Sequence, residues 1–525
     1  MNQTKPNWEE LIDDSLIREL KGDKNTINQP RQVHDAHYSF VGTKKTKKPQ
    51  LIIANRALAA TLGFDNHFID DPQFKSIASG NYTPKAMSPY AMCYGGHQFG
   101  NWAGQLGDGR AINLCQINHE NQSYTLQLKG AGQTPYSRRA DGLAVLRSSI
   151  REYLMSEAMH HLGIPTTRAL SLCLTGDQVL RDMMYDGNSA YEKGAVVCRV
   201  SKSFIRFGNF QIFASRKDLT NLRMLLNYTI NHYYPHIKGN DKDRYIQFFQ
   251  EVSQRTAQLM IEWQRVGFVH GVMNTDNMSI LGETIDYGPY GWLDNYDPDW
   301  TPNTTDNTHK RYRYSNQPYI AQWNLAQLAN ALYPVIEESE PLIEILNAYK
   351  LMYHLAHTNM MASKLGLDPE QIDHSYVDEL GQLLSSEEID MTIFYRQLST
   401  INHDDTVTTC LKKILPAFYD EKASTTRVAW TAWFTDYLHK LRSTKLSNQQ
   451  RQVAMKSVNP KYVLRNYMAQ MAIDQAENND YTLIHELYEL LKSPYLEQPE
   501  NQKWFARRPE WARHKIGCSA LSCSS

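Results

Sequence analysis

The chain has 525 residues, and at roughly 150 residues per domain this length predicts two to four lobes rather than one compact core. Its 55 Lys and Arg residues nearly balance its 56 Asp and Glu residues, and the formal net charge of −1 argues against binding to nucleic acid or an anionic membrane. The seven cysteines form no C-x-x-C pair, which suits a reducing compartment and argues against a zinc site.

The sequence also lacks the marks of a targeting signal or a membrane anchor. The opening MNQTKPNWEELIDDSLIREL carries acidic residues and has no basic stretch followed by an apolar run, so it fits neither a secretion signal nor a transit peptide. No segment approaches the roughly 18 uninterrupted apolar residues of a membrane span. We therefore expect a cytoplasmic protein, monomeric, with neither membrane nor nucleic acid as a partner.

The first chemical signal in chain order is a glycine-rich segment. Residues 1–90 predict a helical and irregular lead-in, with amphipathic helices near Trp8–Leu20 and at Asn55–Leu62. The segment YGGHQFGNWAGQLGDGRAINL follows and is rich in glycine. Because glycine has no side chain, such a segment can approach phosphates closely or can simply form turns. Arg110 adds a fixed positive charge. The glycines are Gly95, Gly96, Gly100, Gly104, Gly107 and Gly109.

Two strands and a helix come next, in the order found in the nucleotide-binding lobe of kinases. Segments 111–116 and 124–129 predict strands joined by a polar turn, and alternation along the second strand points Lys129 away from the core and into a cleft. Residues 145–162 predict a helix with Glu152 two turns in. In kinases, a strand lysine holds the nucleotide phosphates and pairs with a helix glutamate.

Further polar residues are predicted around the same cleft. Asp141 and Gly142 predict a tight turn that faces it. Arg199 and Arg206 stand seven residues apart in the apolar context VVCRVSKSFIRFGNFQIF. Because the guanidinium fork matches phosphate oxygens, the two arginines predict either a clamp on a terminal phosphate or buried structural ion pairs.

From Leu219 onward the apolar periodicity is mainly helical. It predicts a helical C-lobe with an extended tail. The predicted helical segments are 219–264, 317–333, 340–365 and 418–440.

The stretch HGVMNTDNMSILGETIDYG keeps the frame of a kinase catalytic loop and its D-F-G motif. His270 and Asn277 hold the first and last positions of the loop, and Asp286 lies in I-D-Y-G. In kinases the corresponding Asn and Asp bind magnesium. Val272 replaces the kinase base and can neither accept a proton nor form a side-chain hydrogen bond. The frame therefore predicts a metal site without the kinase base, and Asp276 as a base acting from another angle.

The residues alone leave a second interpretation of this loop open. Asn274, Asp276 and Asn277 are also ordinary turn residues. The apolar run from Met278 to Ile285 argues against that interpretation, because it predicts the short hairpin that carries a D-F-G-type aspartate. Residues 294–316 predict a long polar loop where kinases carry an activation or substrate loop.

The motifs YGGHQFG, LGDGRA, LKGAGQTPYSR, ADG, RSSIREYL, IRFG, VHGVMNTDN and IDYGP, in this order, resemble the selenoprotein O family of kinase-like protein adenylyltransferases. The likeness runs from about residue 90 to the C-terminus. It implies an α+β, protein-kinase-like bilobal fold with an N-terminal extension and a helical C-terminal extension. The implied domains are an N-terminal extension (1–90), a nucleotide-binding N-lobe (91–215), a helical C-lobe with the catalytic loop and metal site (216–440), and a C-terminal extension with the terminal cysteine (441–525).

The resemblance also implies an activity. The family holds its nucleotide reversed relative to kinases, which exposes the α-phosphorus, so AMP moves from ATP to Ser, Thr or Tyr of proteins; bacterial relatives add UMP transfer from UTP with manganese. Asp276 looks like the base, Glu152 like the residue that orients Lys129, and Asn277 and Asp286 like ligands of Mg²⁺ or Mn²⁺. The implied nucleotide contacts are Gly107, Gly109, Arg110, Lys129, Asp141, Gly142, Arg199 and Arg206.

The end of the chain departs from the family pattern. Many animal members carry selenocysteine there within C-x-x-U, and Cys523 occupies that place, which implies redox control. However, Ala520 stands where the nearby cysteine would be, and Cys518 is five residues away.

Two other classes of function compete with adenylyl transfer. A phosphotransferase like the aminoglycoside kinases would share the loop H-G-D-x-x-x-x-N, but Val272 argues against it. A non-catalytic nucleotide-binding scaffold would not need the complete set Lys129, Glu152, Asn277 and Asp286.

Overall fold

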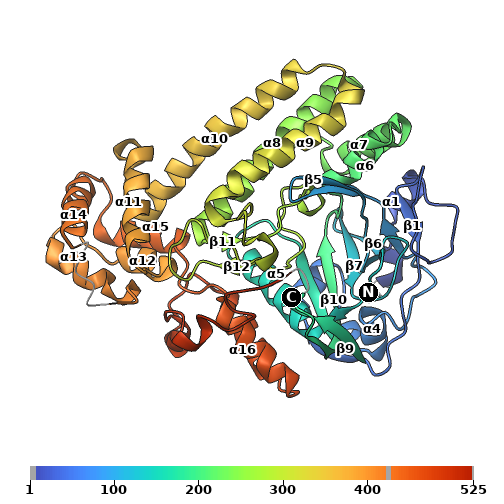
Figure 1. The fold of residues 1–525 in the computed structure, drawn as a ribbon, viewed down its shortest axis with the longest axis horizontal. Helices are drawn as coiled ribbons and strands as arrows, with labels where there is room; N and C mark the ends of the chain where they lie inside the picture. Colours follow the sequence, from blue (N-terminus) through green and yellow to red (C-terminus); the bar gives the residue numbers. More distant parts are fainter. Residues whose placement is uncertain (1–7, 421–426, 523–525) are drawn as a thin grey trace, which may run out of the picture.

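The computed structural model describes residues 8–420 and 427–522. It is a mixed α/β structure in which a twisted sheet lies at one end and long helices lead away from it toward a group of shorter helices (Figure 1). The buried apolar residues form two clusters, one extending from the sheet into the long helices and one within the distant helices.

The central sheet is eight-stranded and antiparallel. Its order is β1 (Tyr38–Phe40), β3 (Tyr90–Met92), β6 (Ala111–His119), β7 (Gln122–Lys129), β10 (Ser189–Ser201), β9 (Arg168–Asp182) and β2 (Gln50–Ala54), with β8 (Ala144–Val145) also paired to β10. The two strands predicted at 111–116 and 124–129 are therefore confirmed as β6 and β7, which pair directly.

The segment 1–90 differs from the predicted helical and irregular lead-in, because β1 and β2 join the sheet at its two edges. Strands this short contain too few residues for alternation to identify them. The helix predicted near Trp8–Leu20 is interrupted, leaving a 3₁₀ turn (Trp8–Leu11) and α1 (Ser15–Glu19). The interruption has a tertiary cause, since the backbone N–H of Asp13 donates to the carbonyl of Gln116 on β6 (3.0 Å).

The helix predicted at Asn55–Leu62 is confirmed as α2 (Arg56–Thr61). Its N-cap is Asn55, whose side chain accepts a hydrogen bond from the N–H of Leu58 (3.0 Å), as expected for an asparagine cap. Two short helices follow, α3 (Asn66–Asp70) and α4 (Pro72–Ala78).

The helix predicted at 145–162 is α5 (Leu146–His161). It packs against β9 and β10 and is buried along almost its whole length. Its centre is therefore next to the strands that carry the charged candidate residues.

From Leu219 onward the chain is mainly helical, as the periodicity predicted. The segment 219–264 forms two helices with a turn between them. Helices α8, α9 and α10 pack on one another, and in Figure 1 α10 runs toward the distant helices. The bounds are α6 (Phe207–Ser215), α7 (Leu219–Tyr233), α8 (Asp241–Val266), α9 (Gln317–Ile336) and α10 (Glu340–Leu365).

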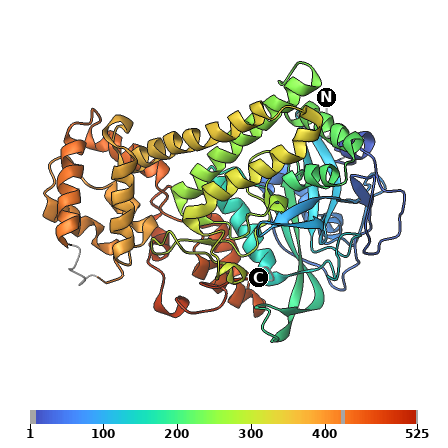
Figure 2. The same ribbon diagram turned by 45° about the horizontal axis from the view of Figure 1, so that its top comes forward.

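The distant helices form a separate group that Figure 2 shows at the far end of α10. They are α11 (His374–Ser386), α12 (Met391–Leu398), α13 (Val407–Ile414), α14 (Arg427–Arg442) and α15 (Asn448–Val458). The helix predicted at 418–440 is thus described from Arg427, and residues 421–426 lie outside the described part.

The chain then returns toward the sheet. Helices α16 (Asn466–Glu477) and α17 (Thr482–Leu491) both pack on α5, so the C-terminal segment supports the helix that carries Glu152. Within the described ranges, none of the helices combines the length and the apolar character that a bilayer span needs. The boundaries of the four domains stay a prediction.

Candidate functional site

A cavity of about 650 Å³ lies between the sheet and the loop that begins at His270. Every candidate residue lines it except Glu152, which lies behind Lys129, and Cys523, which is outside the described residues. The candidate residues in its wall are Gly107, Gly109, Arg110, Lys129, Asp141, Gly142, Arg199, Arg206, Asp276, Asn277 and Asp286. Residues more than 170 positions apart in the chain thus share one wall.

Lys129 and Glu152 form the ion pair expected from their order in the sequence. Lys129 ends β7, and its Nζ lies 2.6 Å from Oε2 of Glu152 on α5, with the glutamate side chain 2 % exposed. Burial lowers the pKa of Lys129 to about 8, and Glu152 limits that fall by favouring the charged ammonium. The lysine is therefore cationic at neutral pH because the glutamate is beside it.

Arg199 and Arg206 form buried ion pairs on the wall of the same cavity. Arg199 on β10 lies 2.9 Å from Oε1 of Glu152 and 2.6 Å from Oδ1 of Asp286, while Arg206 pairs with Oδ2 of Asp286. Burial would raise the pKa of Asp286, but Arg206, Arg199 and Lys129 hold it well below its usual range. Asp286 also has a left-handed backbone (φ 58°), a conformation that costs energy for a residue other than glycine and that the surrounding structure must hold. Lys129, Glu152, both arginines and Asp286 therefore form one continuous charged network.

The loop that begins at His270 is held by the backbone around it. Two short strands, β11 (Phe268–Val269) and β12 (Gly291–Trp292), pair at the base of the loop. His270 is buried, and its Nε2 lies 2.8 Å from the carbonyl of Ile285, which ties the start of the loop to the residue before Asp286. The amide of Asn277 donates to the carbonyl of Val272 (2.9 Å), and this bond leaves the side-chain oxygen of Asn277 for another ligand.

Asp276 sits in the 3₁₀ turn Thr275–Asn277, only 8 % exposed. Burial raises the pKa of its carboxyl to about 6, although Arg206 and Gln98 favour the charged form. Its Oδ2 accepts a hydrogen bond from Nε2 of Gln98 (3.2 Å), and its Oδ1 is buried without a hydrogen-bond partner. A carboxylate with a pKa near neutrality and an uncommitted oxygen has the properties of a general base.

The prediction of a short hairpin between Met278 and Ile285 is wrong. The backbone of its first half bonds to the segment before α6, with Phe207 N–H donating to the carbonyl of Met278 (3.0 Å). Its second half bonds to the segment before β9, with Thr284 N–H donating to the carbonyl of Pro165 (2.8 Å). Each half therefore pairs with a distant segment instead of with the other half.

The glycine-rich segment divides into two parts. Gly107 and Gly109 line the cavity, as does Arg110. The preceding part forms a separate two-stranded hairpin of β4 (Gly95–Gln98) and β5 (Asn101–Gln105), whose glycines do not line it. The prediction of close approach to a ligand thus fits only the end of the segment.

Comparison with known proteins agrees with these motifs. Residues 24–492 match the protein family described as protein adenylyltransferase SelO. The chain belongs to the SelO family. Three similar relatives, each named protein nucleotidyltransferase YdiU, come from Flavobacterium johnsoniae (56 % identical), Aromatoleum aromaticum (52 %) and Rhodopirellula baltica (50 %). In each comparison 98 % of this chain aligns with 99 % of the relative, so the likeness extends over all the elements described above.

The donor atoms in this SelO-family cavity fit a hard divalent cation. Asn277 and Asp286 supply amide and carboxylate oxygens, which magnesium and manganese prefer. Among the described residues, no three His, Cys, Asp or Glu side chains are grouped to hold a metal by themselves. A cation here would therefore need oxygens from the nucleotide phosphates as well, as is usual for magnesium.

Several cavity residues were not among the candidates. Gln98 reaches Asp276 from β4, and Arg138 and Arg139 line the mouth next to Asp141, which pairs with Arg181 (2.8 Å). The motif TPYSRRADG contains Arg138 and Arg139, so two adjacent cations beside a predicted cleft turn were the available signal for these two. For Gln98 the sequence contains no local signal, because its partner is 178 residues away.

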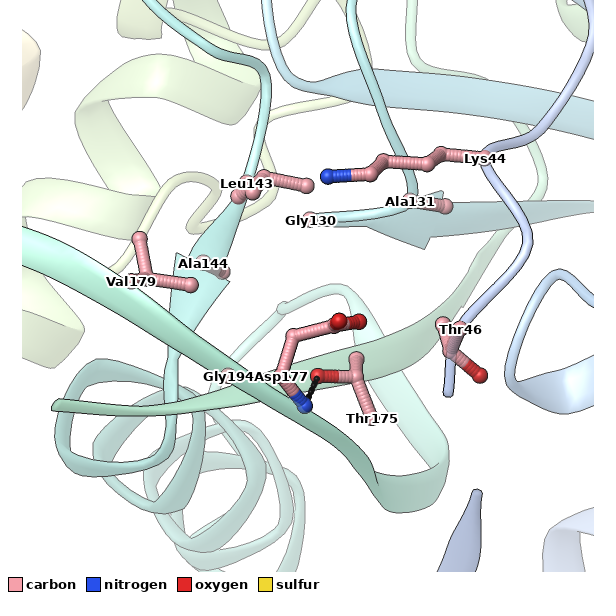
Figure 3. Close-up of a pocket in the computed structure, with 10 residues that line it drawn as sticks. All are labelled: Lys44, Thr46, Gly130, Ala131, Leu143, Ala144, Thr175, Asp177, Val179 and Gly194. Carbon is pink, nitrogen blue, oxygen red and sulfur yellow. Dashed lines mark hydrogen bonds between the residues drawn. The ribbon is translucent and has the colours of Figure 1, made fainter. Parts of the chain in front are cut away.

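A second, far smaller cavity is also lined by Leu143, which lines the large one (Figure 3). Lys44 extends past Gly130 toward Leu143 there, and the N–H of Asp177 donates to Oγ1 of Thr175 (3.1 Å). Its volume of about 10 Å³ holds at most one water molecule. The large cavity is the better candidate for a nucleotide.

Proposed function

We propose that this chain is a protein nucleotidyltransferase that moves AMP from ATP to Ser, Thr or Tyr hydroxyls of proteins and releases pyrophosphate. The observation that carries the proposal is the distribution of charge in the cavity. The cations Lys129, Arg199 and Arg206 line it together with the carboxylate of Asp276, while Val272 occupies the position of the kinase base. Fixed cations suit an anchored pyrophosphate leaving group, and a displaced base suits attack at a phosphorus other than the γ-phosphorus.

The names of the relatives support the same type of reaction. The matched family is described as a protein adenylyltransferase, and relatives at 50–56 % identity are named protein nucleotidyltransferases. We also propose that the sheet with α5 and the helices from α7 onward correspond to the two lobes of a kinase-like fold, because Lys129 and Glu152 pair within the first and the loop from His270 lies within the second.

The reaction requires one bond to form and one to break. The acceptor hydroxyl oxygen bonds to the α-phosphorus of ATP, and the bond from that phosphorus to the bridging oxygen of the β-phosphate breaks. The hydroxyl proton passes to Asp276, which is mostly deprotonated at neutral pH because its pKa is about 6. Lys129, Arg199 and Arg206 stabilise the negative charge that develops on the departing pyrophosphate.

Asn277 and Asp286 are the residues that would hold magnesium or manganese. When bound, such a cation supplies further positive charge to the phosphate oxygens. Asp286 would hold it while remaining paired with Arg199 and Arg206, so the charge network links metal binding to the residues that contact the phosphates.

The label position in ATP tests this proposal. Incubated with a mixture of proteins and magnesium or manganese, the enzyme should transfer label from α-labelled ATP, none from γ-labelled ATP, and release pyrophosphate. Transfer of the γ-label would establish a phosphotransferase instead, and tight ATP binding without transfer of either label would establish a scaffold. Mass spectrometry of the acceptors should show added AMP; added UMP in a parallel reaction with UTP and manganese would identify the preferred nucleotide.

A further inference from the structure

Strand β4 lies alongside the catalytic loop and contacts it at successive positions. The N–H of His97 donates to Oγ1 of Thr275 (2.7 Å), and the N–H of Phe99 donates to Oδ1 of Asn274 (3.1 Å). Between these two bonds, Nε2 of Gln98 donates to Oδ2 of Asp276 (3.2 Å). Each residue of the loop from Asn274 to Asp276 is thus bonded to β4 or to Phe99, the residue directly after it.

Glycine allows this close approach. A Cβ built on Gly96 would lie 2.7 Å from Oδ1 of Asp276, and a Cβ on Gly208, the second residue of α6, would lie 2.1 Å from the carbonyl oxygen of Gly95. Real Cβ atoms do not come this close to other heavy atoms, so a side chain at Gly96 would push the strand away from Asp276, and one at Gly208 would push it away from α6. Gly96 of YGGHQFG therefore allows contact with Asp276, a role different from the phosphate contact predicted for the segment.

The other loop bonds give the strand a fixed position. Thr275 also donates to Oε1 of Gln211 on α6 (2.6 Å), and Asn274 also accepts a hydrogen bond from the hydroxyl of Tyr312 (2.6 Å). The loop is thus fastened on three sides by hydrogen bonds to buried or half-buried groups. Because the loop is held in this way, the Gln98 carboxamide has a fixed position from which it donates to Asp276.

The carboxylate of Asp276 has few other donors. Among the described residues, Gln98 supplies the one side-chain hydrogen bond to it, and Oδ1 is buried without a partner. Both oxygens of a carboxylate are acceptors, so a donor that binds one oxygen fixes the rotation of the group and leaves the remaining lone pairs for another proton. A base must be held in a narrow range of orientations to take a proton from the attacking hydroxyl.

We propose that Gln98 is a positioning residue for the transfer reaction, and that its carboxamide orients the Asp276 carboxylate toward the acceptor hydroxyl. This inference rests on the proposed role of Asp276 as the base. In this proposal β4 helps to position the base that acts on the acceptor hydroxyl, whereas Lys129, Arg199 and Arg206 contact the phosphates of ATP.

Two substitutions of Gln98 separate the effect of its hydrogen bond from the effect of its side-chain shape. Gln98→Glu keeps the size of the side chain but replaces the amide donor with a carboxylate that repels Asp276, and Gln98→Leu removes the polar group. Both should lower kcat for AMP transfer by about ten- to a hundredfold, with ATP affinity and the thermal unfolding midpoint close to those of the wild type. Asn101→Ala, on the exposed strand of the same hairpin, is the matched control and should leave kcat unchanged.

If Gln98→Glu retained wild-type kcat, only the shape of the side chain would matter and the inference would be overturned. A double-mutant cycle with Asp276→Asn supplies the second readout. If Gln98 acts through Asp276, adding Gln98→Leu to Asp276→Asn should lower kcat no further. Additive losses would show that Gln98 acts elsewhere and would overturn the inference while leaving the proposed function intact. Wild-type turnover by Asp276→Asn alone would instead overturn the proposed base and this inference with it.

Discussion

Glu152→Gln is expected to weaken ATP binding by removing the charge on which Lys129 depends. The glutamate side chain is 2 % exposed and pairs with Lys129 at 2.6 Å and Arg199 at 2.9 Å. Burial already lowers the pKa of Lys129 to about 8, so loss of its main opposing charge should lower that pKa further and leave less of the amine charged at neutral pH. In the wild-type protein, by contrast, the affinity for ATP should fall only above about pH 8, where Lys129 loses its proton.

The size of the effect follows from the contacts that are lost. A hydrogen bond to a charged group contributes about 1.5–3 kcal/mol, so the Kd for ATP at neutral pH should rise by roughly ten- to a hundredfold. Breaking a buried ion pair costs about 3–5 kcal/mol; the lower end applies here because Arg199 keeps Asp286 as a partner. At about 2–4 °C per kcal/mol, the unfolding midpoint of the sheet-bearing part should fall by roughly 6–12 °C.

Glu157→Gln provides a control on the same helix. Glu157 is as buried as Glu152 and pairs with Arg168 at 2.7 Å, but Arg168 does not line the cavity, whereas Lys129 and Arg199 do. Its substitution should lower the unfolding midpoint by a similar amount and leave the Kd for ATP unchanged. The assay is ATP titration by calorimetry from about pH 6.5 to 9, with thermal unfolding of each variant. Wild-type ATP affinity of Glu152→Gln over that whole range would refute the reasoning.

Three further changes test other parts of the site. Asp286→Ala should abolish metal-dependent ATP binding, because no neutral side chain replaces a carboxylate that holds the cation, and full AMP transfer by this variant would contradict the metal assignment. Val272→Asp, which restores the kinase residue, should create no transfer of γ-label; a gain on the order of a hundredfold would favour a phosphotransferase. Burial raises the pKa of Glu283 to about 7, so the stability from its neutral form is present at low pH and is lost as the pH rises through 7. Because Glu283 is half-buried, Glu283→Gln should stabilise the fold by about 1 kcal/mol at pH 8 and by less at pH 6, measured by denaturant unfolding; equal effects at both pH values would contradict the burial argument.

Local pattern determined much of the fold and most of the site. The alternation along 124–129 was sufficient to place Lys129 on a cavity wall, and the helical period of 145–162 was sufficient to bring Glu152 within reach of it. The motif that begins at His270 likewise predicted that Asn277 and Asp286 lie in one site, and both line the cavity. Each of these predictions depends on a period or a spacing within a few dozen residues. In a strand or a helix, such a spacing determines the direction in which a side chain points.

Only the tertiary structure decided which groups the side chains contact. Sequence left Arg199 and Arg206 as either a phosphate clamp or ion pairs, and the structure pairs both with Asp286 on the cavity wall, so that phosphates and metal would meet one shared network. It also placed Gly96 against Asp276 and gave the two halves of segment 278–285 different partners. The physical reason is that hydrogen-bond partners and close approaches of the backbone depend on residues far away in the chain, whereas periodicity in a sequence reports only which face of an element is buried.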